Sequence, residues 1–233
     1  RARSDPLTRR VNPLITDPVR DNAVWNRGVD FVPNKILRKL YRQFATLGGG
    51  NHFLEMQSDE DGQAWLMLHT GSRYLGVVIR DLFVEEASGR PGIDDRLFRK
   101  LPYIHVEDPL WERYLKGQQF AMDFAKESRR EIMIRALEVI GKYFDESWSS
   151  SPEAYLDGNG IDIAHNYVHR EVWNGKDLFI HRKGAILLPK GSMGVIPGSM
   201  GSCSDIVEGR GNRLAFDSAA HGAGRKLSRA AAM

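Results

Sequence analysis

Four of the seven histidines lie where an apolar segment meets a turn that contains glycine or asparagine. Junctions of this kind place side chains at the rim of a sheet, where convergent sites are built. Neutral imidazoles that converge from several strands are a common ligand set for Mn²⁺, Zn²⁺ or Fe²⁺. The four are His52, His69, His165 and His221. The same contexts also suit histidines that make only structural hydrogen bonds, and the sequence leaves both interpretations open.

Glycine-rich segments accompany these histidines at 48–50, 198–201 and 222–224. Each could be an ordinary turn, but glycine also lets backbone N–H groups approach an anionic phosphate closely. His221, which has small neighbours and is followed by Arg225, could then lie against a phosphate. A histidine nitrogen that attacks phosphorus forms a phosphoramidate, which is a known covalent strategy. The spacing therefore indicates a site for metal and phosphate, without a named substrate.

Apolar periodicity predicts the elements that position these residues. The N-terminal part is expected to hold helices and a hairpin, at 36–44, 52–57, 64–69, 73–87 and 110–144. A Ser-, Pro- and Gly-rich loop is expected at 147–160. The C-terminal part is expected to hold short strands and a last helix, at 161–168, 177–181, 184–188, 195–196, 214–217 and 226–232. The class is α+β, because helices and strands do not alternate regularly.

The composition is that of an ordinary globular protein. The 233 residues are 42% hydrophobic and 27% charged, which fits one large domain or two small ones and disfavours disorder. No apolar run approaches the roughly 18 residues of a membrane span, and no signal peptide is evident, so we expect a cytoplasmic protein without membrane contact. The net charge of +3 is too small to indicate nucleic-acid binding by itself. One cysteine, Cys203, excludes an internal disulfide.

Six motifs, taken in order, resemble the RtcB-type RNA ligases over roughly residues 40–233. They lie at 48–55, 69–73, 165–168, 182–185, 196–201 and 221–225. The resemblance implies the central part of one RtcB-like catalytic domain, with mixed sheets around a metal and nucleotide site. Residues 36–233 carry the matched motifs, and residues 1–35 match poorly.

Ligases of this family join an RNA 2′,3′-cyclic phosphate or 3′-phosphate end to a 5′-hydroxyl end, in tRNA splicing or RNA repair, with GTP and two Mn²⁺ ions. The resemblance implies that His221 takes GMP from GTP and passes it to the RNA 3′-phosphate. It implies that His52 binds one Mn²⁺ ion, and that His69 and His165 bind the other. It also implies that Arg73 contacts an RNA phosphate, and that an archease-like activator is a further candidate partner.

The same resemblance implies a guanine nucleotide pocket. Asn51 and Asn166 would contact the nucleotide phosphates, and Glu55 and Ser199 would read the guanine edge. A carboxylate accepts from the N1–H and N2–H₂ donors of guanine, a pair that adenine lacks, so GTP is expected rather than ATP. The other residues placed in the pocket are Phe53, Pro197, Gly198, Met200 and Ser204, with Gly222, Ala223 and Gly224 around the phosphate.

The chain also departs from the family pattern. The family's Asp-x-x-Cys-Gly motif, whose cysteine bridges both metal ions, has no counterpart, and Cys203 lies in a different loop. The family's C-terminal guanine-binding lysine has no counterpart either. We therefore expect a chain truncated at both termini that is inactive, or nearly so, by itself.

Two other functions are compatible with parts of the pattern. A catalytically inactive RNA-binding or scaffold relative would suit the truncation, but all four site histidines are retained. A metallohydrolase acting on phosphoesters would use the histidines, yet it would not account for Glu55, Ser199 and the His-Gly-Ala-Gly segment together. The ligase interpretation accounts for every motif.

Overall fold

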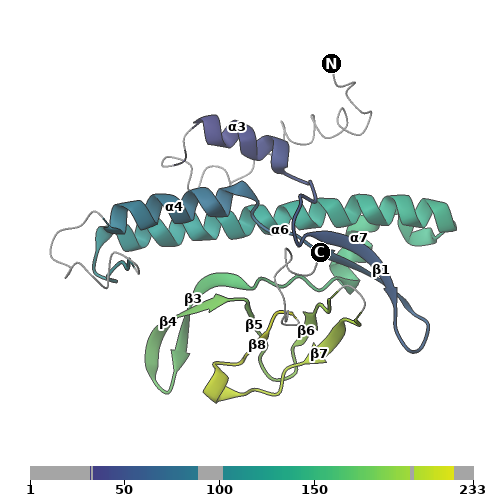
Figure 1. Ribbon diagram of the computed structural model, residues 1–233. Coiled ribbons are helices and arrows are strands. Elements are labelled where there is room, and N and C mark those ends of the chain that lie inside the picture. The colour runs from purple at the N-terminus through teal and green to yellow at the C-terminus, as the bar shows by residue number, and fades with distance from the viewer. Residues whose placement is uncertain (1–31, 33, 89–101, 200–201, 223–233) are drawn as a thin grey trace. The chain divides into compact units, whose positions relative to one another are not determined.

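The computed structural model describes residues 32, 34–88, 102–199 and 202–222. The chain divides into two compact units, Arg1–Leu156 and Asp157–Met233. The first unit is mainly helical and the second is built from short antiparallel strands (Figure 1). Helices and small sheets together confirm the predicted α+β class, but the predicted mixed sheets were wrong for the described strands, which all pair antiparallel.

Three helices form the core of the first unit: α3 (Asn34–Gln43), α4 (Tyr74–Ser88) and the long α6 (Pro109–Phe144). Their apolar faces meet in one cluster, which includes Leu40, Leu75, Ile79, Phe83, Leu110, Phe120 and Phe124. α6 begins where the Asp108 carboxylate accepts a 2.8 Å hydrogen bond from the Leu110 amide and a proline follows it. It ends at Asp145, whose left-handed backbone stops the helix.

The antiparallel hairpin of the first unit pairs β1 (Phe53–Ser58) with β2 (Ala64–His69). Asp59 stabilises its turn, because the carboxylate accepts from the amides of Asp61 and Gln63 and from the Trp65 indole. The register places Phe53 opposite His69. His52, one residue before β1, therefore lies at the same end of the hairpin as His69.

α6 also fixes the loops at this end of the hairpin. The hydroxyl of Ser128, a fully buried residue, accepts from the Ala45 amide at 3.0 Å. The Arg129 guanidinium donates to the Thr70 carbonyl at 3.2 Å. The middle of the long helix thus holds both segments that flank the two histidines.

The described residues of the second unit form three antiparallel strand pairs. β3 (Asn166–Trp173) pairs with β4 (Lys176–Lys183) through a tight turn at Asn174 and Gly175, both with positive φ. The other pairs are β5 (Ala185–Leu187) with β8 (Ser218–Ala220), and β6 (Met193–Ile196) with β7 (Asp205–Glu208). β5 follows β4 directly and pairs with β8. The C-terminal end of β4 and the C-terminal end of β8 are therefore neighbours.

Several predicted elements of the C-terminal half were wrong. The strand expected at 161–168 begins only at Asn166 and runs to Trp173. The strand expected at 214–217 is instead the 3₁₀ turn η2 (Arg213–Ala215), which Asn212 caps at the Leu214 amide. The loop expected at 147–160 contains η1 (Ser147–Ser150) and α7 (Pro152–Asn159). The last predicted helix, at 226–232, lies outside the described residues.

In the described part of the chain, none of the helices has both the length and the apolar character needed to cross a membrane.

Candidate active site

In the first unit, His52 and His69 lie close together at the end of the hairpin, with ring centroids 6.2 Å apart. The Phe53 ring stacks on His69 at 5.5 Å, as expected for residues opposite each other on paired strands. The Asn51 amide nitrogen lies 3.5 Å from His69 Nε2. Phe53 and Asn51, both expected to contact the nucleotide, are thus also neighbours of the His69 imidazole.

Three groups contact His52 Nδ1: the Thr70 hydroxyl at 3.4 Å, and two groups with opposite hydrogen-bonding roles. The Leu47 carbonyl lies 3.0 Å from this nitrogen, and the Arg73 guanidinium lies 2.8 Å from it. A carbonyl only accepts and a guanidinium only donates, so Nδ1 serves one of them at a time. Burial lowers the pKa of His52, and the positive charge of Arg73 lowers it further. The ring is therefore neutral at physiological pH, which is the form that binds a metal ion.

The donor chemistry in the first unit fits a divalent metal ion, but the ligand set is partial. Two imidazoles lie side by side, and one of them has a lowered pKa. Within the described ranges, no three His, Cys, Asp or Glu side chains gather closely enough to hold one ion. His52 and His69 can therefore each supply one ligand to a divalent metal ion.

In the second unit, His165 and His221 form another pair, with ring centroids 4.1 Å apart. The Gly184 carbonyl accepts from the His221 backbone amide at 3.3 Å and lies 2.9 Å from His221 Nδ1. Because a carbonyl cannot donate, this contact requires the proton on Nδ1. In the neutral ring, Nε2 then carries the lone pair and is the nucleophilic nitrogen.

Gly184 joins several of the predicted residues. Its amide donates to the His165 carbonyl at 2.7 Å and to the Asn166 side-chain oxygen at 3.0 Å. Its φ of +68° is a left-handed conformation that favours glycine. A Cβ added at this position would lie 3.4 Å from His221 Nδ1. The backbone of Gly184 therefore packs directly against the imidazole and connects it to His165 and Asn166.

The predicted nucleotide loop closes on itself beside His221. Ser204 accepts from the Gly198 amide at 3.1 Å, and Ser202 accepts from the Ser199 amide at 2.7 Å. A Cβ built on Gly222 would lie 3.4 Å from the Pro197 carbonyl oxygen, so this loop borders the segment after His221. The predicted residues Met200, Ala223 and Gly224 lie outside the described residues.

The structure groups the predicted residues into two sets, one in each unit. The first set holds Asn51, His52, Phe53, Glu55, His69 and Arg73, and the second holds His165, Asn166, Pro197, Gly198, Ser199, Ser204, His221 and Gly222. Glu55 is exposed on β1, where Gln57 donates to it. Sequence reasoning did not point to the Gly184 carbonyl as a hydrogen-bond partner of His221, although Gly184 lies in the matched segment 182–185.

Comparison with known proteins shows which family the chain resembles. The family model described as tRNA-splicing ligase RtcB matches residues 17–233, which is most of the chain. The chain belongs to the RtcB family. The match begins at residue 17, ahead of the first sequence motif at 48–55.

Curated relatives come from bacteria, archaea and eukaryotes. The RNA-splicing ligase RtcB of Escherichia coli (strain K12) is 35% identical over 221 residues, covering 91% of this chain and 54% of that protein. The tRNA-splicing ligase RtcB of Pyrococcus furiosus is 34% identical over 242 residues, covering 87% of this chain and 24% of that protein. The RNA-splicing ligase RtcB homolog 1 of Entamoeba histolytica is 31% identical over 248 residues, covering 91% of this chain and 46% of that protein. The RtcB chain described here thus spans about half the length of the E. coli relative.

Proposed function

We propose that this chain carries the nucleotidyl-transfer centre of an RNA ligase that joins 2′,3′-cyclic phosphate or 3′-phosphate ends to 5′-hydroxyl ends. The observation that carries the proposal is the 2.9 Å contact between His221 Nδ1 and the Gly184 carbonyl. This contact directs the lone pair to Nε2 of an imidazole that lies beside His165. Membership of the RtcB family supports the reaction class.

In the proposed first step, His221 Nε2 attacks the α-phosphorus of GTP. The N–P bond forms as the bond from the α-phosphorus to the bridging oxygen breaks, and pyrophosphate leaves with that electron pair. The phosphorylated ring keeps its Nδ1 proton and becomes cationic. The Gly184 carbonyl accepts from that proton and stabilises the charge. Positioning and electrostatics therefore come from the same backbone oxygen.

In the later steps, an oxygen of the RNA 3′-phosphate attacks the phosphorus of the histidine-bound GMP, and the N–P bond breaks. The RNA end is then activated, because GMP is a good leaving group. The 5′-hydroxyl attacks the RNA phosphorus, loses its proton and forms the new phosphodiester as GMP departs. A cyclic phosphate end must first be opened by water to a 3′-phosphate.

His52, His69 and His165 are the residues that would hold Mn²⁺. Their imidazoles suit this ion, and the neutral state of His52 favours binding. When bound, the metal supplies positive charge that offsets the charge of the triphosphate. His52 is assigned to one ion, and His69 and His165 to the other, as the family resemblance implies.

Glu55 and Ser199 would select the nucleotide. Glu55 is exposed on β1 and able to accept from both donors of the guanine edge. The Asn166 oxygen accepts from Gly184, so its NH₂ group can donate to a nucleotide phosphate. Arg73 would contact RNA after leaving His52, because its guanidinium now lies against that imidazole.

The test is transfer of label from GTP labelled at the α-phosphate, in the presence of Mn²⁺. It uses the whole chain and a chimera in which residues 17–233 replace the matching segment of the E. coli relative. We expect label on the chimera and little on the chain alone, because its described residues supply a partial metal site.

The label should disappear in the His221→Ala variant of the chimera and persist in His105→Ala, a matched control at an exposed histidine. Label that survives His221→Ala would overturn the proposed nucleophile. A chimera that folds and binds GTP but takes no label would favour a catalytically inactive relative.

A further inference from the structure

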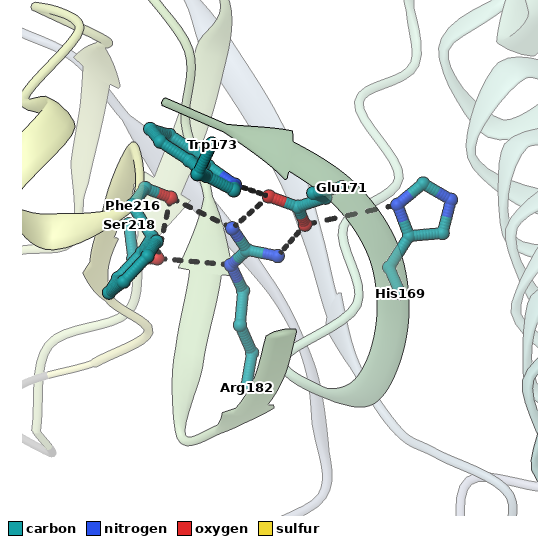
Figure 2. A network of polar contacts seen from close by, with 6 residues as sticks. All are labelled: His169, Glu171, Trp173, Arg182, Phe216 and Ser218. Atoms are coloured by element: carbon teal, nitrogen blue, oxygen red, sulfur yellow. Dashed lines mark hydrogen bonds and ion pairs between the residues drawn. The ribbon is translucent and has the colours of Figure 1, made fainter. Parts of the chain in front are cut away.

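A buried network lies in the second unit and consists of residues to which the proposed mechanism gives no role. Arg182 on β4 is 3% exposed and forms a two-point ion pair with Glu171 on β3 (Figure 2). The Trp173 indole donates to the same carboxylate at 2.9 Å. The ion pair therefore links the two strands of the β3–β4 hairpin.

The same guanidinium reaches a third segment. Arg182 Nε donates to the Ser218 hydroxyl at 3.0 Å, and its Nη2 donates to the Phe216 carbonyl at 2.8 Å (Figure 2). Ser218 is the first residue of β8. Arg182 thus ties the end of the β3–β4 hairpin to the start of the strand that leads into His221.

These ties flank the contact that orients the proposed nucleophile. Arg182 lies two residues before Gly184, and Ser218 lies three residues before His221. Between them, Ala185 pairs with Ala220, and the Gly184 carbonyl meets His221. A shift of β8 along β5 would move His221 Nδ1 away from the Gly184 oxygen. The network is placed where it resists such a shift.

The segment that Arg182 holds has an unfavourable backbone. Phe216 and Asp217 are consecutive residues with φ of 50° and 45°, a conformation that residues other than glycine rarely adopt. Such a conformation persists when the surroundings fix it. The Arg182 bond to the Phe216 carbonyl and the edge-to-face packing of Trp173 on the Phe216 ring at 5.2 Å supply that restraint.

We propose that Arg182, held by Glu171, is a positioning residue that keeps the Gly184 carbonyl on His221 Nδ1 and so selects the tautomer with its lone pair on Nε2. The inference rests on the proposed function, because it gives that tautomer a role in nucleotidyl transfer. Arg182 touches neither nucleotide nor RNA in this role. Its effect reaches the site through β4 and β8.

A second ion pair on the same hairpin provides the comparison. Arg170 on β3 forms a two-point pair with Asp177 on β4, but both side chains are largely exposed. Arg170 and Asp177 bind each other within the hairpin, whereas Arg182 also binds the segment entering β8. Arg170→Lys is therefore a matched control, with the same chemical change on the same hairpin.

The first experiment measures the protonation of the His221 ring nitrogens by ¹⁵N NMR on the whole 233-residue chain. His221→Gln identifies the signal. We expect the Nδ1–H tautomer in the unaltered chain and in Arg170→Lys. We expect a mixture of tautomers in Arg182→Lys and in Ser218→Ala, which loses one bond to Arg182 and retains the ion pair. Should Arg182→Lys fail to fold, Ser218→Ala decides. An unchanged His221 tautomer in the folded variants would overturn the inference.

The second experiment measures label transfer from GTP in the chimera described above. We expect Arg182→Lys to lower the rate constant of transfer about 10-fold or more, because small misplacements of a nucleophile are costly. The apparent affinity for GTP should stay within about three-fold, as expected for loss of a transition-state interaction. Weaker GTP binding with an unchanged transfer rate would count against positioning.

The two experiments separate the two proposals. A tautomer change in the variants, together with no label on any chimera, would sustain the positioning role of Arg182 and reject the proposed function. If the chimera takes label and Arg182→Lys transfers it at the full rate, the proposed function would be sustained and the positioning role of Arg182 rejected.

Discussion

The proposed nucleophile depends on a backbone atom. The sequence pointed to His221 because of its small, glycine-rich surroundings, but it could not show which ring nitrogen carries the proton. That property comes from the Gly184 carbonyl, 37 residues away along the chain. Side-chain types are visible in a sequence, whereas a carbonyl belongs to every residue. The histidines were therefore predictable and their hydrogen-bond partners were not.

Replacing Gly184 with alanine should disturb the His221 ring directly. The new Cβ would lie 3.4 Å from Nδ1 and 3.5 Å from Cε1, in a left-handed backbone that costs a non-glycine residue about 1–2 kcal/mol. We expect label transfer in the chimera to fall about 10-fold or more, measured as the single-turnover rate.

Gly175→Ala is the matched control for backbone strain. Gly175 has a φ of +74°, and nothing lies within 4 Å of a Cβ built there. The Gly175→Ala variant should lose a similar free energy of unfolding, about 1–2 kcal/mol, and its rate of label transfer should be unchanged. Equal loss of transfer in both variants would show that strain, and not contact with His221, is responsible.

At the level of elements, the sequence predicted the first unit well because its elements are long and periodic. The helix expected at 110–144 is α6, and the strand expected at 64–69 is β2. The C-terminal strands have three to eight residues, so few positions define their pattern. The Asn174–Gly175 pair is a hairpin signal, and it would have predicted that the strand β3 continues up to Trp173. β8 has three residues, which is too few to be predicted from a sequence pattern.

Ser128 tests how α6 holds the first histidine pair. It is fully buried, and its hydroxyl accepts from the Ala45 amide in the segment that leads to His52. Ser128→Ala leaves that amide without its acceptor, so we expect a loss of about 1–3 kcal/mol in the free energy of unfolding. Urea denaturation measures it. Ser88→Ala, at an exposed helix end, should change stability little.

Glu171 should make the second unit sensitive to acid. Burial alone would raise its pKa, but hydrogen bonds from Arg182 and Trp173 outweigh burial, so the pKa lies below its ordinary value. A lowered carboxyl pKa contributes stability above the unfolded-state value, about 4.3, and that contribution is lost as the pH falls toward the folded-state pKa. Glu171→Gln should therefore be less stable than the unaltered chain at pH 7, by up to about 3 kcal/mol, and the gap should narrow in acid.

Hydrogen exchange of the β3 and β4 amides, measured in urea at pH 7 and pH 3, checks this difference. Asp177→Asn is the control, because the pKa of Asp177 is also lowered by a hydrogen bond, from Arg170, but the pair is exposed. It should show little difference between the two pH values. If the stability difference between Glu171→Gln and the unaltered chain were larger at pH 3 than at pH 7, the assigned role of the ion pair would be contradicted.

At the level of the whole molecule, the four predicted histidines fall into two pairs, one in each unit. His52 and His69 belong to the first, and His165 and His221 belong to the second. The order of motifs predicted which residues share a function, since that order matches the RtcB family. The proposed assignment of His69 and His165 to one Mn²⁺ ion predicts that the two residues are energetically coupled.

A double-mutant cycle on Mn²⁺ binding measures that coupling. If His69 and His165 bind the same ion, removing either one loses most of its affinity, and removing both costs much less than the sum of the two single losses. We expect this non-additivity for His69→Ala with His165→Ala, measured by electron paramagnetic resonance of free Mn²⁺ during titration of the chimera. His52→Ala with His165→Ala should be closer to additive, because these residues are assigned to different ions. Additive losses for the His69–His165 pair would show that the two units do not share an ion.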